Sequence, residues 1–181
     1  MARSARRATF LKLLRRVFVT GFSFGDSESS SKSNLRMTPV SQHELLLRRY
    51  SPVNPNHITK DEGTGKPVLN WSALEFDEDG CSVYREKLLL EDGLTRDAIL
   101  DPPYVGIATT MAADVERYSV QTGAATVHPF FVLASPRTER PPLPTDRAHA
   151  SIREREGHGL SARKLDKARR GLGRHAFTVV E

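Results

Sequence analysis

A Ser-rich polar tract at residues 26–34 (DSESSSKSN) divides this chain into two parts of different character. Such a tract cannot bury enough apolar surface to fold, so we expect ordered structure to begin after it. The change falls between Met37 and Glu44, where an apolar segment starts. The sequence therefore predicts one compact domain over residues 43–181, preceded by a disordered basic leader over residues 1–40. Met37 offers an alternative start of translation at this boundary.

The leader also contains a short amphipathic pattern. Residues 10–18 place apolar side chains on one helical face and Lys12, Arg15 and Arg16 on the other. Such a helix could contact an anionic membrane, a nucleic acid or a partner protein. The polar tract that follows instead favours a disordered or misassigned extension. No stretch approaches the roughly eighteen apolar residues of a membrane span, so the sequence predicts no transmembrane segment.

Charge and cysteine content limit the partner and the compartment. The net charge of +5 belongs to the ends, because eight bases and two acids precede Pro39 and eight bases and four acids follow His149. The middle of the chain is therefore acidic, and the overall charge says little about a nucleic-acid partner. Cys81 is the only cysteine, which excludes an intrachain disulfide and a C-x-x-C pair and fits the reducing cytoplasm. We interpret Cys81 as a small buried hydrophobe.

Short apolar runs alternate with turn residues, which predicts an α+β fold with one small mixed or antiparallel sheet and three or so short helices. The expected strands are residues 44–50 (where a short helix would also fit), 68–76, 81–84, 105–109, 128–134 and 148–152. The expected helices are residues 85–90, 95–100, 111–118 and 161–175, capped in the last three cases by Thr95, Thr110 and Ser161. The acidic turn at residues 77–80 predicts a hairpin between the second and third strands.

The last of these helices is basic and amphipathic. Four cations recur along one face, and small or apolar side chains occupy the opposite face. The cations are Arg163, Lys167, Arg170 and Arg174, and the apolar face carries Leu165, Ala168, Leu172 and Ala176. Such a ridge could neutralise several phosphates. The solvated outer face of a docked helix has the same pattern, and it is the interpretation that we prefer.

An acidic cluster has the spacing of a calcium-binding loop. The residues concerned are Glu75, Asp77, Asp79, Gly80 and Glu86. The first position carries Glu where Asp is usual, and the eighth carries a polar Ser. A hairpin turn with solvated acids explains the same residues, and the six histidines show no compact ligand spacing. The sequence therefore predicts no metal site.

Several short motifs occur in the order seen in a family of short uncharacterised bacterial proteins, which this chain resembles over residues 47–175. The motifs are Arg48, Arg49 and Tyr50 followed by Pro55 and His57, an S-x-x-x-F stretch at residues 72–76, S-V-Y at residues 82–84, and A-H-A-x-I at residues 148–152. The resemblance implies a bacterial source. The family has no established activity, so it implies no function.

The front half of the chain also resembles ADP-ribosyltransferase folds, including small toxins. The resemblance implies that Arg48 or Arg49 holds the pyrophosphate of NAD and that Ser82 holds the nicotinamide ribose. Such enzymes usually need a third polar residue, commonly Glu. His149 and Glu154 are the candidates here, and neither lies in a recognisable motif. NAD is the only cofactor implied, and only under this hypothesis.

No strong catalytic motif stands out, so the sequence favours a small soluble cytoplasmic domain that binds a protein partner and performs no chemistry of its own. Two hypotheses stay open beside it. One is an NAD-binding, ADP-ribosyltransferase-like protein or toxin. The other is nucleic-acid binding through the C-terminal helix. The sequence alone does not decide whether the chain is an enzyme.

Overall fold

The structure is a computed structural model that describes residues 38–137 and 143–180. Internal contacts group the chain into two units, Met1–Asn34 and Leu35–Glu181. The described residues all belong to the second unit. The predicted leader up to residue 37, with its amphipathic pattern and the alternative start at Met37, lies outside the described residues.

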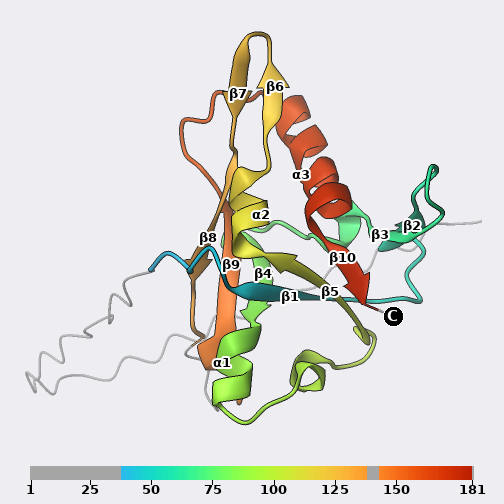
Figure 1. The fold of residues 1–181 in the computed structure, drawn as a ribbon, viewed down its shortest axis with the longest axis vertical. Helices are drawn as coiled ribbons and strands as arrows, with labels where there is room; N and C mark the ends of the chain where they lie inside the picture. The colour runs from blue at the N-terminus through green and yellow to red at the C-terminus, as the bar shows by residue number, and fades with distance from the viewer. Residues whose placement is uncertain (1–37, 138–142, 181) are drawn as a thin grey trace, which may run out of the picture. The chain divides into compact units, whose positions relative to one another are not determined.

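Six strands form one antiparallel sheet in the order β10–β5–β1–β4–β9–β8, as Figure 1 shows. This sheet confirms the predicted α+β class. The strands are β1 (Leu45–Tyr50), β4 (Cys81–Arg85), β5 (Gly106–Met111), β8 (Phe130–Ala134), β9 (His149–Glu154) and β10 (Thr178–Val180).

Three helices and two small hairpins surround the sheet. The helices are α1 (Glu86–Glu91), α2 (Ala112–Arg117) and α3 (Ala162–Ala176). One hairpin pairs β2 (Ile58–Lys60) with β3 (Pro67–Leu69), and the other pairs β6 (Val120–Thr122) with β7 (Ala125–Val127). Short 3-10 turns at Trp71–Ala73, Arg96–Ile99 and Asp146–Ala148 connect the longer elements.

Side chains along each strand alternate between two faces of the sheet, and each face packs against different helices. One face, which we call the α3 face, carries the main core. Its buried residues include Leu46, Val83 and Ile152 from the strands, Val115 from α2, and Ala168 and Leu172 from α3. The opposite α1 face has a smaller core that includes Leu47, Tyr84 and Ile107 from the strands and Leu89 from α1.

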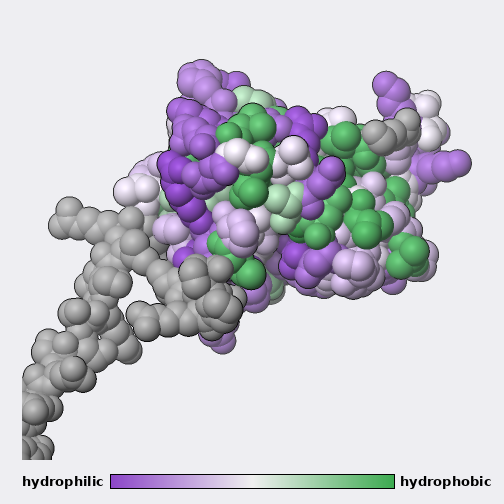
Figure 2. All heavy atoms as spheres, turned by 90° about the horizontal axis from the view of Figure 1, so that it is seen from below, coloured by the Kyte–Doolittle hydropathy of each residue, from purple (hydrophilic) through white to green (hydrophobic). Residues whose placement is uncertain are grey.

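Apolar side chains that remain exposed come from separate elements. Seen from below, hydrophobic residues gather in separate areas with hydrophilic residues between them (Figure 2). The large exposed apolar residues of the described ranges are Val53, Trp71, Leu90, Val105, Leu143 and Val180. Trp71 is the only aromatic residue among them, which draws attention to its surroundings.

The predicted hairpin between residues 68–76 and 81–84 is wrong. Strand β3 pairs with β2, whereas β4 pairs with β1 and β9. The chain turns away after β3 because the Asn70 side chain accepts a hydrogen bond of 2.8 Å from the Trp71 amide and starts a 3-10 turn. Thr110 is likewise no helix cap, since it lies within β5 and α2 begins at Ala112.

The short segment before β1 joins the sheet at the outer edge of β8. The Val40 amide donates to the Val132 carbonyl at 3.2 Å, and the Ala134 amide donates to the Thr38 carbonyl at 2.8 Å. The Val40 side chain is buried in the main core. Among the described residues, hydrogen bonding to the sheet thus starts at Thr38 and side-chain burial starts at Val40, before the apolar run that marks β1 in the sequence.

Candidate functional site

Helix α3 is amphipathic as predicted. Ala168 and Leu172 are fully buried, and Arg163, Lys167, Arg170 and Arg174 are all exposed. Gly171 and Gly173 lie inside the helix, which continues through both of them to Ala176. The helix is therefore held by its apolar side and presents its cations to solvent.

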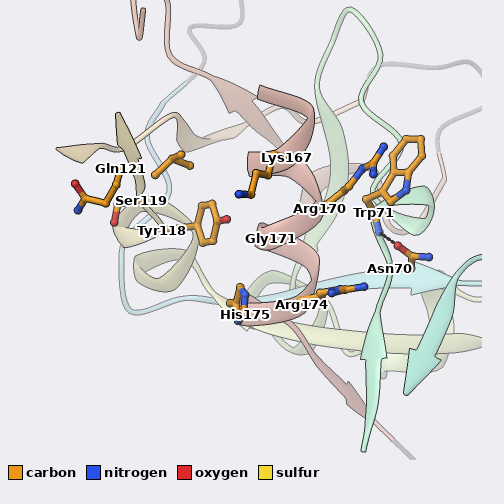
Figure 3. Close-up of a pocket in the computed structure, with 11 residues that line it drawn as sticks. Asn70, Trp71, Tyr118, Ser119, Gln121, Lys167, Arg170, Gly171, Arg174 and His175 are labelled. Atoms are coloured by element: carbon orange, nitrogen blue, oxygen red, sulfur yellow. Dashed lines mark hydrogen bonds between the residues drawn. The ribbon is translucent and has the colours of Figure 1, made fainter. Parts of the chain in front are cut away.

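A groove of about 720 Å³ runs along the basic side of α3, as Figure 3 shows. One wall is the helix, and the others are the turn at Asn70 and Trp71 and the segment that connects α2 to β6. We call it the α3 groove. It is lined by Asn70, Trp71, Tyr118, Ser119, Val120, Gln121, Lys167, Arg170, Gly171, Arg174 and His175. Three of the four predicted basic residues line it, and Arg163 does not.

The charge of the α3 groove is uncompensated at its walls. No carboxylate lines it, and Lys167, Arg170 and Arg174 form no ion pair with any residue in the described ranges. Arg169 behaves differently, because its guanidinium pairs with Glu154 at 2.6 Å. Asp61 lies outside the groove. Hydrogen bonds from Thr64 lower its pKa most, and Arg174 adds a smaller effect.

Two aromatic rings stand beside these cations. Trp71 is 46% exposed, and the guanidinium carbon of Arg170 lies 5.3 Å from its ring centre. Tyr118 points across the groove toward Gly171 in Figure 3. Burial raises the pKa of the Tyr118 phenol, so this ring stays neutral and available for apolar contacts. An exposed aromatic next to free cations is a chemical combination suited to a ligand with both rings and negative charge.

A second polar cluster lies on the α1 face. Nε2 of His149 lies 3.1 Å from Oγ of Ser82, and Nδ1 lies 2.7 Å from the carbonyl oxygen of Ser135. Oγ of Ser135 in turn lies 2.8 Å from Oγ of Ser151. These side chains border a cavity of about 310 Å³ that Asp77, Asp79, Arg137 and Arg153 also line. We call this group the Ser82–His149 cluster.

The two arginines proposed to hold NAD lie on different faces of the sheet. Arg48 is buried on the α3 face and donates to the main-chain carbonyls of Ala73 at 2.7 Å and Ser82 at 2.8 Å. Arg49 pairs with Asp101 at 2.6 Å and lies 5.0 Å from the centre of the Tyr104 ring. Ser82 and His149 thus meet through their side chains, and Arg48 meets only the Ser82 backbone.

The other candidate for the third NAD-binding residue, Glu154, is the partner of Arg169 on α3. No atom of Arg48 or Arg49 lines the cavity beside the Ser82–His149 cluster. Both arginines have structural partners, which accounts for their burial and position without a ligand. The NAD-binding hypothesis stays a prediction.

The acids with calcium-loop spacing form a turn before β4. Asp77 and Gly80 face each other in an isolated bridge, and the side chain of Asp77 accepts the Asp79 amide at 2.8 Å. Glu86 lies further on and pairs with Arg96. Within residues 38–137 and 143–180, no group of three or more His, Cys, Asp or Glu side chains is placed to hold a metal ion. No helix in these ranges is long and apolar enough to cross a bilayer.

Two buried titratable groups serve the fold. Glu44 accepts two hydrogen bonds from Arg85, at 2.7 and 2.8 Å, and this partner holds the pKa of the carboxyl below its ordinary value. His57 is buried, and its Nδ1 accepts the Ser51 amide at 3.0 Å. Burial lowers the pKa of His57, mainly by removing water from the charged form. The imidazole is therefore neutral in the folded protein.

Several residues of both sites carry no recognisable signal in the sequence. Trp71 and Tyr118 lie in loops or at a helix end, where no periodic pattern marks them. The signal that could have identified Trp71 is a lone Trp after Asn, because Asn often starts a turn and connecting segments usually run over the surface. Ser135 and Ser151 were missed because Ser is common in strands and loops alike.

The fully buried Cys81 matches the interpretation of this thiol as a small hydrophobe, and burial raises its pKa.

Comparison of the chain with protein-family models, curated proteins and solved structures gives no match.

Proposed function

We propose that the α3 groove binds single-stranded nucleic acid. The observation that carries this proposal is the presence of three unpaired cations and an exposed tryptophan in one groove without a carboxylate. An unpaired surface cation costs nothing to leave in solvent, but three that converge on one concave surface create a local positive potential. A polyanion is the partner that such a surface attracts most strongly.

The helix sets the length of strand that could be contacted. Lys167 and Arg174 are separated by two turns of α3, which corresponds to roughly 10 Å along the axis at 1.5 Å per residue. A stacked strand advances by about 3.4 Å per nucleotide, so this distance spans about three phosphates. Arg170 lies between the two on the same side. The row of cations is therefore about as long as three stacked nucleotides.

The aromatic residue favours a single strand over a duplex. Bases of a duplex are stacked on each other, whereas unpaired bases can stack on an exposed ring and contribute about 1–3 kcal/mol each. Trp71 offers such a ring, and Arg170 beside it can hold a phosphate or stack in turn. An acidic protein would satisfy the cations but would leave the indole without a matching planar group. The protein-partner hypothesis is thus the second choice.

The test uses the single tryptophan as an internal reporter. A 12-nucleotide deoxythymidine strand is titrated into the full chain in low salt, and Trp71 fluorescence is recorded. We expect quenching, with affinity that falls steeply as salt is added. Arg170→Glu should weaken binding at least tenfold. Lys164→Glu makes the same kind of change on the same helix, outside the groove, and should have little effect.

Three results would contradict the proposal. They are an absence of quenching, equal losses from both substitutions, and equally tight binding of polyglutamate. The last would show that the groove accepts any polyanion and that the indole plays no part. Equal losses would show that net charge, and not the groove, attracts the strand.

A further inference from the structure

We propose that Ser82 and His149 form a nucleophile–base pair that hydrolyses carboxylic esters in the cavity on the α1 face of the sheet. This site is separate from the α3 groove, because strands β4 and β9 place the two side chains on the side of the sheet away from α3. The inference does not depend on nucleic-acid binding. It rests on hydrogen-bond geometry at His149.

The Ser135 carbonyl fixes the tautomer of His149. A carbonyl oxygen can only accept, so Nδ1 at 2.7 Å carries the proton that it donates. The Ser135 hydroxyl lies 3.0 Å from the same nitrogen and can direct its own proton to Ser151, 2.8 Å away. In the neutral ring, Nε2 is then an acceptor, and the Ser82 hydroxyl at 3.1 Å is the donor that meets it. A serine hydroxyl that donates to an imidazole whose other nitrogen is held is the arrangement of an activated nucleophile. Here the main-chain carbonyl of Ser135 holds the ring at Nδ1.

The pair is held rigidly from several directions. Ser82 lies on β4 and pairs in register with Ser151 on β9, the strand that also carries His149. The Ser82 carbonyl accepts a hydrogen bond from the buried Arg48, which fixes its peptide group. The His149 ring packs edge-on against Tyr84 at 5.6 Å. Such fixed positions favour reaction because the geometry needs no further ordering.

The cavity beside the pair has room for a small ester and supplies a donor for its oxygen. Its volume is about 310 Å³, and Ser82 and His149 both line it. Arg153 also lines it, and a terminal nitrogen of its guanidinium lies 3.5 Å from a carboxylate oxygen of the exposed Asp79. A guanidinium in such a long, exposed pair can donate to the negative oxygen that develops during ester cleavage. Arg137 adds a second positive group, and Asp77 and Asp79 balance the charge of the two arginines at the cavity wall.

The reaction uses only these residues and water. Oγ of Ser82 attacks the ester carbonyl carbon as its proton passes to Nε2 of His149, and the carbonyl π electrons move to the oxygen. The intermediate then collapses, the C–O bond to the alcohol breaks, and His149 returns the proton to the departing oxygen. Water attacks the acyl-serine by the same route, with His149 again taking and returning a proton. The products are an acid and an alcohol, and Ser82 is restored.

The first test is covalent labelling of the full chain with a fluorophosphonate, followed by intact-mass and peptide mass spectrometry. We expect one adduct on Ser82, none with Ser82→Ala, and a rate at least about 100-fold lower with His149→Gln. Ser41→Ala, which removes an exposed serine far from the cavity in sequence, should label normally. An unlabelled wild-type chain, or an adduct on another serine, would overturn the proposal.

A second test remains informative if His149→Gln fails to fold. Ser82→Cys places a thiol beside Nε2, and its alkylation by iodoacetamide is compared with that of the buried neighbour Cys81 in the wild type. An activated site predicts fast alkylation at position 82 and almost none at Cys81. Equal, slow alkylation at both positions would show that the cluster only satisfies buried polar groups, and it would refute the nucleophile.

Discussion

The hydroxyl oxygen of Tyr118 lies 1.8 Å from the point where a Cβ at Gly171 would be placed. No side chain can occupy that position unless the tyrosine moves. A glycine inside a helix destabilises it by about 1 kcal/mol relative to alanine. Helix propensity alone therefore predicts that Gly171 destabilises α3. The structure gives the reason for it, since Gly171 lets Tyr118 reach across the α3 groove to the helix backbone.

Gly171→Ala should therefore destabilise the protein despite its better helix propensity. Displacement of Tyr118 is expected to cost roughly 1–3 kcal/mol, more than the helix gains. Thermal unfolding measures the net effect, and the affinity for the deoxythymidine strand should fall as well. Tyr118→Phe removes the clashing oxygen, so the double variant should recover part of the stability. A single variant as stable as the wild type would show that Tyr118 moves freely.

Glu44→Gln should be among the most damaging conservative changes. It leaves the Arg85 guanidinium in a partly buried position without its charged partner, since the two side chains are only 10% and 19% exposed. We expect a loss of roughly 2–4 kcal/mol in unfolding free energy, measured by urea denaturation. Lys87→Gln breaks an exposed pair with Glu91 and should cost about 0.5 kcal/mol or less. Similar losses of unfolding free energy from the two substitutions would mean that the Glu44–Arg85 pair is as solvated as the Lys87–Glu91 pair.

Stability should decline in two steps as pH falls. The folded pKa of His57 lies below its ordinary value of 6.5, so below that pH the unfolded chain binds a proton that the folded chain refuses. The folded pKa of Glu44 lies below 4.5, and the stability from its pair is lost as pH falls from about there. His57→Asn keeps an acceptor near the position of Nδ1 and should remove only the first step. Melting temperatures measured across this pH range test the prediction. A wild-type protein that shows no first step would argue against a neutral buried His57.

Arg174→Gln should change the salt dependence of oligonucleotide binding in a defined way. Each cation that contacts a single-strand phosphate contributes about 0.7 to the slope of log affinity against log salt concentration. Removing one contact should lower the slope by about that amount. Arg163→Gln serves as the comparison, because Arg163 lies on the same ridge of α3 but outside the groove. Unchanged slopes in both variants would place the phosphates elsewhere.

Local sequence patterns predicted the long elements but not the contacts between them. The run at residues 128–134 predicted β8, and the spacing of Ala168 and Leu172 predicted the buried side of α3, because each pattern is complete within a few residues. The hydrogen bond between Ser82 and His149 joins residues 67 positions apart. The resemblance to ADP-ribosyltransferase folds named both residues, but no local pattern shows that their side chains meet. Strands of three residues, such as β6 and β10, were not predicted, because three positions are too few to show the alternation of apolar and polar side chains that marks a strand.

The α3 groove illustrates the same limit. The spacing of its cations predicts a basic ridge on one side of α3. The sequence pattern does not predict which side chains lie opposite that ridge, and a solvated face is therefore the simpler interpretation. The aromatic wall comes from Trp71 and Tyr118, which reach the helix only through the folding of other segments. The sequence pattern therefore predicts the basic wall of the groove but not its aromatic wall or its shape.

The pairing of Thr38 and Val40 with the outer edge of β8 affects how a partner could dock. Pro39 faces Leu133 in this short bridge and has no amide hydrogen to offer a further strand. At the other side of the sheet, β10 has only three residues, and β3 lies beside it. Recruitment by β-augmentation, in which a peptide extends the ladder through its backbone, is thus disfavoured at both edges. Any ligand would then be recognised by side chains on the two faces of the sheet, and these can be substituted without any change to the hydrogen-bonded ladder.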